Sequence, residues 1–210
     1  MKVLFWLLGS AAVVLVGLVI AWWVVVRGVE TPDYTLVAQE DGLELRDYPA
    51  LRVAEVERSG SRGDAVSAGF RPLAGYIFAR EREGDSIAMT APVTQTPEGE
   101  GRWLVRFIMP EHYSLEDLPR PAGDAVTLRE LEPQRMAAIR FSGRADDALV
   151  EEHERRLRDW MAERGLEAAG GPVYAYYDDP MTPGFLRRNE VLIPVQEAPE
   201  AAENRLEEGR

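Results

Sequence analysis

The amino-acid sequence contains an internal repeat, which limits the folds that the chain can adopt. The segment 43–60, LELRDYPALRVAEVERSG, aligns without a gap on the segment 126–143, VTLRELEPQRMAAIRFSG, after a shift of about 83 residues. The identical pairs are Leu45 and Leu128, Arg46 and Arg129, Arg52 and Arg135, Ala54 and Ala137, Ser59 and Ser142, and Gly60 and Gly143. Chance alone would seldom place so many identities in one order and phase. The sequence therefore predicts a domain made of two similar halves.

Both copies of the repeat have the pattern of two strands that lead into a helix. Each copy has an acidic turn with a proline, Pro49 or Pro133, then an alternation typical of a half-buried strand, and then Ser-Gly. An amphipathic helical pattern follows each copy. We therefore expect two units of strand, strand, helix, strand, strand, which close on each other about a pseudo-two-fold axis.

The remaining patterns place the other elements of this α+β domain. We expect strands at 34–38, 43–48, 52–57, 87–94, 103–109, 173–177 and 190–195. A first helix at 65–78 would bury Val66, Phe70, Leu73, Ala74 and Ile77, with a kink at Pro72. A second helix would start after Asp146 or Asp147, end at Gly165, and bury Leu149, Leu157, Trp160 and Met161.

The amino-terminal run 3–26 has no charged residue and is long enough to cross a hydrocarbon core of about 30 Å as a helix. A cleaved signal peptide is the alternative, but its apolar core is usually only about 7–15 residues long. Lys2 precedes the run, whereas Arg27 is soon followed by Glu30 and Asp33. The positive-inside rule then predicts a single-pass inner-membrane protein whose domain lies on the periplasmic or extracellular side.

Composition excludes several classes of function. The net charge of −12 argues against nucleic acid as a partner, because the phosphates would be repelled. The absence of cysteine excludes disulfides, thiolate metal sites and cysteine nucleophiles. We expect an anchor and linker at 1–29, one domain at 30–196, and a disordered acidic tail at 197–210.

Several motifs resemble the SOUL, or heme-binding protein, family over residues 30–195. They are Glu30-x-Pro32-x-Tyr34, Leu45-Arg46-x-Tyr48, GFRPLAGYI at 69–77, IAMTAPV at 87–93, YDDP at 177–180 and RRNEV at 187–191. The resemblance implies a distorted antiparallel β-barrel of two repeats with two helices. That fold is similar to the effector-binding domains of some transcription regulators, and it agrees with the repeat.

The same resemblance implies non-enzymatic binding of heme or another flat tetrapyrrole in a groove bounded by the first helix. The resemblance matches Phe70, Leu73, Ala74 and Tyr177 to positions proposed to line the groove. We add Ile77 on the same helix face, and Arg187 and Arg188, as candidate ligand-binding residues. One animal branch of the family is thought to use a histidine directly after the arginine of Leu-Arg-x-Tyr as axial ligand. Asp47 occupies that position here, and a carboxylate is a poor ligand for heme iron.

The two arginines before Glu190 have two interpretations. Arg187 and Arg188 could hold carboxylates such as heme propionates, because guanidinium groups bind carboxylates in a bidentate geometry. The alternative is that they satisfy loop carbonyls and pair with Asp178, Asp179 or Glu190, and we favour this structural role because Pro180 and Pro183 indicate a loop that needs such contacts.

Candidate metal ligands and nucleophiles are few. His153 falls on the apolar stripe of the second helix, where it is either a core residue or a ligand, and we expect His112 on the surface. Met89 and Met181 are further candidates for thioether ligation of iron. The serines lie in no GxSxG motif, so nucleophilic catalysis has no support. The alternative to tetrapyrrole binding is an envelope structural or interaction protein with a vestigial groove.

Overall fold

The computed structural model describes residues 29–80 and 82–196. The chain divides at Glu30, and the unit that begins at Thr31 contains the elements below. They are β1 Thr35–Glu40, β2 Leu43–Tyr48, β3 Leu51–Ser59, α2 Arg62–Ile77, β4 Val93–Pro97, β5 Arg102–Ile108, β6 Thr127–Leu131, β7 Gln134–Ser142, α3 Asp147–Glu163, β8 Val173–Tyr176, the 3-10 helix η1 Gly184–Leu186 and β9 Arg188–Pro194.

The strands form one nine-stranded antiparallel sheet in the order β1-β2-β7-β9-β8-β4-β5-β3-β6. Without β1 this order is two-fold symmetric. The repeat mates are β2 and β6, β3 and β7, β4 and β8, and β5 and β9, and the two members of each pair lie equally far from the centre of the sheet. The register agrees as well, since Tyr48 pairs with Gln134 and their repeat mates Leu131 and Leu51 also pair. The fold therefore has the two-fold repeat that the sequence predicts, with the β4–β8 pairing at its centre.

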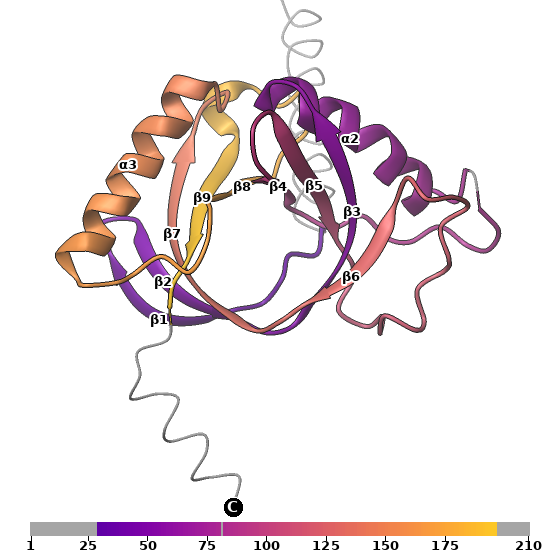
Figure 1. The fold of residues 1–210 in the computed structure, drawn as a ribbon, viewed down its shortest axis with the longest axis horizontal. Helices are drawn as coiled ribbons and strands as arrows, with labels where there is room; N and C mark the ends of the chain where they lie inside the picture. Colours follow the sequence, from indigo (N-terminus) through magenta and orange to yellow (C-terminus); the bar gives the residue numbers. More distant parts are fainter. Residues whose placement is uncertain (1–28, 81, 197–210) are drawn as a thin grey trace, which may run out of the picture. The chain divides into compact units, whose positions relative to one another are not determined.

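The prediction of a closed barrel is wrong, because the sheet stays open. β1 and β6 are its two edges, and no pairing joins them among the described strands. β1 lies outside the two-fold repeat, and its ladder with β2 is interrupted by a register shift between Leu36 and Ala38. Such a bulge twists an edge strand away from further pairing. The sheet is strongly curved, and both helices lie outside the curve (Figure 1).

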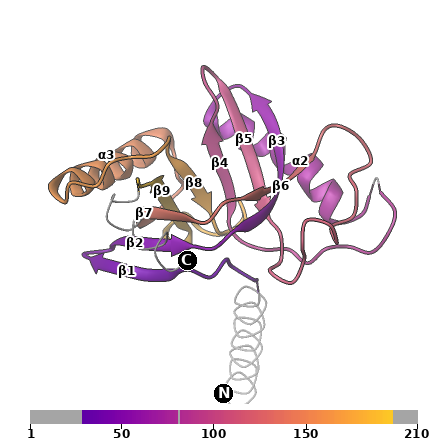
Figure 2. The same ribbon diagram turned by 60° about the horizontal axis from the view of Figure 1, so that its bottom comes forward.

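Each helix covers one half of the sheet and encloses a core of its own. Figure 2 shows α2 beside β3 and β5, and α3 beside β7 and β9. The core under α2 includes Leu73, Ile77, Val56 and Val105, and the core under α3 includes Leu157, Trp160, Ile139 and Val191. Neither α2 nor α3 covers the other face of the sheet, which we call the helix-free face with respect to the described residues.

Both helices begin at a capping side chain in the region that the sequence indicates. Ser61 accepts a hydrogen bond from the backbone N–H of Asp64, and Asp146 accepts one from Leu149. The helix α2 runs through Pro72, which has no N–H to offer to the carbonyl of Ala68. The Nε of Arg58 donates to that carbonyl at 3.4 Å instead. A side chain of β3 thus replaces the missing helical hydrogen bond.

The predicted strand at 87–94 is wrong for most of its length, because β4 starts only at Val93. Pro92 cannot donate to a strand ladder. Ile87 donates its backbone N–H to the carbonyl of Ile77 at 2.9 Å, so the segment follows the end of α2. β4 then continues to Pro97.

Within the described residues, no helix is long and apolar enough to span a membrane. The predicted anchor at 3–26 and the predicted acidic tail at 197–210 lie outside those residues.

Candidate functional site

The helix-free face of the sheet carries a buried polar cluster. In β2, Leu43 and Leu45 face α3, so alternation turns Glu44, Arg46 and Tyr48 to the other face. In β9, Val191 and Ile193 face α3, so Glu190 lies on the same face as Arg46. We call Tyr34, Glu44, Arg46, Tyr48, Tyr177, Arg188 and Glu190 the Glu190 cluster.

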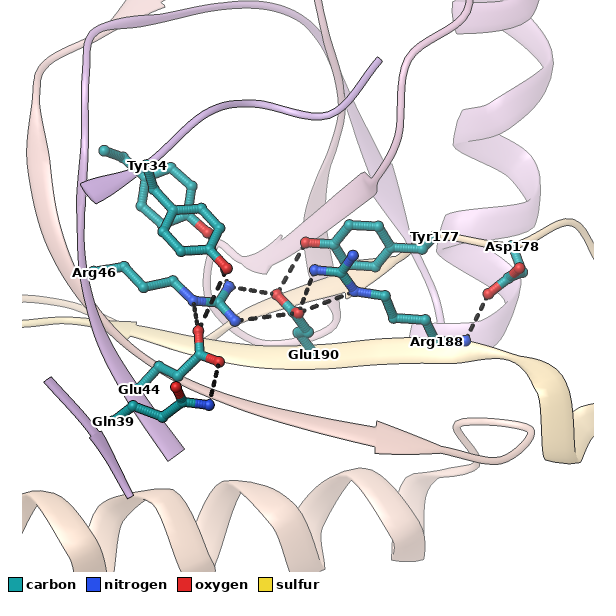
Figure 3. Close-up of polar contacts among 9 residues, drawn as sticks. Tyr34, Gln39, Glu44, Arg46, Tyr177, Asp178, Arg188 and Glu190 are labelled. Carbon is teal, nitrogen blue, oxygen red and sulfur yellow. Dashed lines mark hydrogen bonds and ion pairs between the residues drawn. The ribbon is translucent and has the colours of Figure 1, made fainter. Parts of the chain in front are cut away.

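The carboxylate of Glu190 is the centre of this cluster (Figure 3). Arg46 donates to it through Nη1 at 2.7 Å and Nη2 at 3.3 Å. Arg188 donates through Nη2 at 2.7 Å and Nε at 3.1 Å, and the Tyr177 hydroxyl donates at 2.9 Å. Glu44 accepts from the Nε of Arg46 at 2.6 Å. Strands β2 and β9 and residue 177 are thereby joined through one buried anion.

Burial and charge fix the protonation of these groups. Glu190 and Arg46 are each 1% exposed. Burial alone would raise the pKa of Glu190, but hydrogen bonds and charge from Arg46 and Arg188 outweigh it and hold that pKa below its usual range. Burial raises the pKa of Tyr48 to about 12 and also raises the pKa of Tyr177. At neutral pH the carboxylate is therefore charged and both phenols are neutral; Tyr177 donates to Glu190, and Tyr48 accepts from the Nη1 of Arg46 at 3.0 Å.

Aromatic rings cover both guanidinium groups of the Glu190 cluster. The guanidinium carbon of Arg46 lies 4.4 Å from the ring centre of Tyr34, and that of Arg188 lies 3.8 Å from the ring centre of Tyr177. Tyr34 also packs on Tyr48, with ring centres 5.3 Å apart. Cation–π contacts of this kind add to the ion pairs. The cluster provides a neutralised, packed anion rather than an activated acid, base or nucleophile.

A second buried carboxylate lies on the same face in the other half. Glu55 is 5% exposed and pairs with the Nε of Arg106 at 2.8 Å and the Nε of Arg129 at 2.5 Å. Arg129 is the repeat mate of Arg46. The helix-free face therefore places each of two carboxylates between two arginines.

The predicted groove residues of α2 divide between the core and the surface. Leu73 and Ile77 are fully buried against the sheet, and Ala74 is 7% exposed. Phe70 is 43% exposed and meets the ring of Phe107 edge-on at 5.3 Å. Phe78 directly follows the helix and is 42% exposed. Because positions 70, 74 and 78 are spaced by four, the exposed Phe70 and Phe78 lie on one side of α2 with the buried Ala74 between them, and we call these three residues the α2 stripe.

The structure does not bring the predicted residues 177, 187 and 188 to this stripe. Tyr177 and Arg188 belong to the Glu190 cluster on the opposite face of the sheet. Arg187 donates to the carbonyls of Thr182 and Pro180. These contacts match the structural interpretation of the two arginines, and ligand binding by them stays a prediction.

The four candidate metal ligands are either held in contacts within the fold or exposed at its surface. His153 donates from Nδ1 to the carbonyl of Leu149 at 2.7 Å and stacks on Phe141, with ring centres 4.2 Å apart. His112 is exposed beside Tyr113. Met89 is 45% exposed and Met181 is 90% exposed. In the part of the chain that the structure describes, no three His, Asp or Glu residues gather as a metal site.

Asp47 stands at the position where the family resemblance implies a histidine ligand in one animal branch, and its carboxylate forms an ion pair. The two oxygens of Asp47 accept from Arg135 Nε at 2.7 Å and Nη2 at 2.8 Å. This bidentate geometry is among the strongest that a carboxylate can have. Asp47 therefore links β2 to β7.

A cavity of about 190 Å³ lies on another side of α2 and is not indicated by the sequence. Its lining residues are Pro72, Tyr76, Arg82, Pro121, Ala122, Gly123, Asp124, Ala125 and Val126. Sites for drug-sized ligands usually have about 300–1,000 Å³. This cavity alone is too small for a ligand of that size.

Comparison with known families gives a match over nearly the whole described domain. The family described as SOUL heme-binding protein matches residues 29–194. The chain belongs to this family. No curated protein matches the chain in sequence.

Solved structures show the same fold at low identity. The C-terminal domain of EcmrR has a TM-score of 0.56 and 11% identity, and the match covers 79% of this chain and 99% of that one. A structure named as a hydrolase from Listeria innocua has a TM-score of 0.52 and 14% identity, with 76% of this chain and 94% of that one covered. At these identities the likeness concerns the fold alone.

Proposed function

We propose that the domain binds heme or another flat tetrapyrrole on the α2 stripe and catalyses no reaction. The observation that carries the proposal is the family match over residues 29–194. The stripe supports it locally, because Phe70 and Phe78 offer two half-exposed aromatic rings on one side of α2. A flat macrocycle would gain stacking and apolar burial there.

The side chains considered as iron ligands favour binding of a tetrapyrrole through its ring rather than through a histidine–iron bond. Asp47 is engaged by Arg135, and His153 by Leu149 and Phe141. Met89 is accessible in the segment that follows the end of α2, so it is the thioether that could approach a bound iron. Heme would supply redox and ligand-binding chemistry, and the chain would supply an apolar surface.

We further propose that the domain is tethered to the inner membrane and lies on its periplasmic or extracellular side. The support is the uncharged run 3–26 and the charges that flank it. A carboxyl-terminal reporter that is active only outside the cytoplasm should therefore be active. Activity of a reporter that works only in the cytoplasm would overturn this orientation.

Hemin titration of a chain that starts at Glu30, followed by Soret absorbance, tests the binding proposal. Phe70→Ser should weaken binding by about 0.5–1.5 kcal/mol, or roughly two- to tenfold in Kd, through lost stacking. The matched control is Phe185→Ser, because Phe185 is also exposed but lies in the β8–β9 loop. Replacing both His112 and His153 with Ala should keep most of the affinity.

Two results would count against the proposal. Loss of affinity in Phe185→Ser with none in Phe70→Ser would move the site off α2. The absence of any saturable Soret change would favour the alternative, an envelope structural or interaction protein with a vestigial groove.

A further inference from the structure

The β8–β9 loop, residues 177–187, presents an unusual apolar surface. Among the residues that the structure describes, its Met181, Phe185 and Leu186 are the most exposed large hydrophobic side chains, at 90%, 78% and 52%. Single exposed apolar residues are normal on protein surfaces. Three exposed apolar side chains on one short loop indicate a surface that binds an apolar partner.

Several backbone groups of this loop are hydrogen-bonded within the loop, and the exposed Asp179 side chain is one of the partners. Asp179 accepts from the backbone N–H of Met181 at 2.6 Å and of Thr182 at 3.2 Å, and from the Thr182 hydroxyl at 3.0 Å. The Nε of Arg187 donates to the carbonyl of Thr182 at 2.8 Å, and its Nη2 donates to the carbonyl of Pro180. Carbonyl and N–H groups that are satisfied in this way cost little to remove from water.

The loop is also fastened to the domain at both ends. Arg188 donates its backbone N–H to Asp178 at 2.6 Å, and Gly143 donates to the carbonyl of Gly184 at 3.1 Å. Arg144 lies against the loop, since a Cβ added to Gly184 would come within 3.1 Å of its Cγ. The apolar side chains are therefore held outward and do not fold back onto the core of the domain.

We propose that this loop inserts Met181, Phe185 and Leu186 into the interface of a lipid bilayer. Apolar side chains on a backbone with internal hydrogen bonds suit the hydrocarbon boundary. The exposed Arg144 beside the loop has a long stem, which lets its charge stay at the level of the headgroups.

The length of chain before the domain favours lipid over other occupants. The uncharged run ends at Val26 and β1 begins at Thr35. The connecting residues 27–34 can extend over no more than about 29 Å. If the run crosses a bilayer, the domain stays beside that bilayer. The proposal goes beyond tetrapyrrole binding and shares only the membrane tether with it.

Single-cysteine labelling tests the proposal on the full chain, which has no native cysteine. Phe185→Cys and Met181→Cys would each carry an environment-sensitive fluorophore in nanodiscs of phosphatidylcholine. Glu100→Cys, exposed in the turn between β4 and β5, is the control. A label at Val14→Cys reports separately whether the run 3–26 enters lipid. We expect blue-shifted emission and quenching by nitroxide lipids at 185 and 181, severalfold above the signal at 100.

The outcomes separate the loop from the tether. If the label at 14 is in lipid while those at 185 and 181 are quenched by aqueous iodide as strongly as that at 100, the proposal is overturned. If the label at 14 is not in lipid, the tether is wrong, and the chain is instead added to phosphatidylcholine vesicles. Entry of the loop labels into those vesicles supports insertion, and labels that remain in water overturn it. Protection of the loop labels only after a second protein is added also overturns it.

Discussion

Replacing Glu190 by Gln should remove the anion on which the helix-free face depends. The amide keeps one oxygen but turns an NH₂ group toward donors from Arg46, Arg188 and Tyr177. Arg46 is 1% exposed and would keep only Glu44 as an anionic partner among its described contacts. Leaving a buried cation without its main counter-ion is the costly way to break an ion pair.

The expected loss follows from this burial. Breaking a buried ion pair on one side typically costs about 3–5 kcal/mol. The matched control is Glu57→Gln, because Glu57 pairs with Arg102 at 3.3 Å with both side chains more than half exposed. Exposed pairs of this kind contribute only about 0–1 kcal/mol. Removing both charges, in Arg46→Leu with Glu190→Leu, should cost less than the sum of the two single substitutions.

Urea unfolding of a chain that starts at Glu30 measures these differences. Such a chain has Trp103 and Trp160 as its only tryptophans, and both pack in or against the core under α3. A loss for Glu190→Gln no larger than that for Glu57→Gln would refute the reasoning. It would mean that water reaches Arg46 in solution. Additive losses in the double variant would show that Arg46 and Glu190 do not act as a pair.

Three further predictions concern stability. Because the pKa of Glu190 is lowered in the fold, the stability that its charge contributes is present above its ordinary pKa of 4.5 and is lost as the pH falls through the folded value. The difference in unfolding free energy between wild type and Glu190→Gln should therefore become smaller in acid, and urea midpoints measured against pH can show this. Gly143→Ala should cost more than Gly60→Ala, since both need a positive φ but only the former would bring a Cβ within 2.4 Å of Leu149, and thermal unfolding ranks the two. The chain that starts at Glu30 should be monodisperse and unfold cooperatively in chromatography and urea titration, whereas the full chain should need detergent.

The repeat predicts the backbone well because alternation and turn residues are local signals. The Ser-Gly that ends each copy coincides with positive φ at Gly60 and Gly143, a conformation that few other residues adopt. The segment 87–92 reads as a strand because its apolar residues are dense, but Pro92 removes the ladder hydrogen bond that a strand needs. Closure of the sheet is a property of its two edges, and no local pattern reports whether distant edges meet.

The candidate site was harder to predict, since its partners are far apart in the chain. Arg46 and Glu190 are separated by 144 positions. Alternation along β2 shows that Arg46 faces away from Leu45, but it does not show that this second face is buried. The spacing of Phe70, Ala74 and Phe78 does place these residues on one margin of the helix once the core positions Leu73 and Ile77 are assigned. The prediction places Phe70, Leu73, Ala74 and Ile77 together in one groove, and periodicity alone cannot separate the middle of a helix face from its margin.

The two halves share cations but differ in their anions, and this difference makes them chemically unequal. Arg46 and Arg129 occupy equivalent strand positions. In the strand register, Glu190 on β9 lies opposite Arg140 on β7. The equivalent position in the first half is Leu104 on β5, which lies opposite Glu57 on β3. Because an apolar residue stands where Arg129 would need its counter-ion, that arginine pairs with Glu55 on the neighbouring strand instead. The repeat therefore dictates the positions of Arg46 and Arg129, while single differences decide which carboxylate each one neutralises: Glu190 against Leu104 outside the repeated segments, and Glu55 against Ala138 within them.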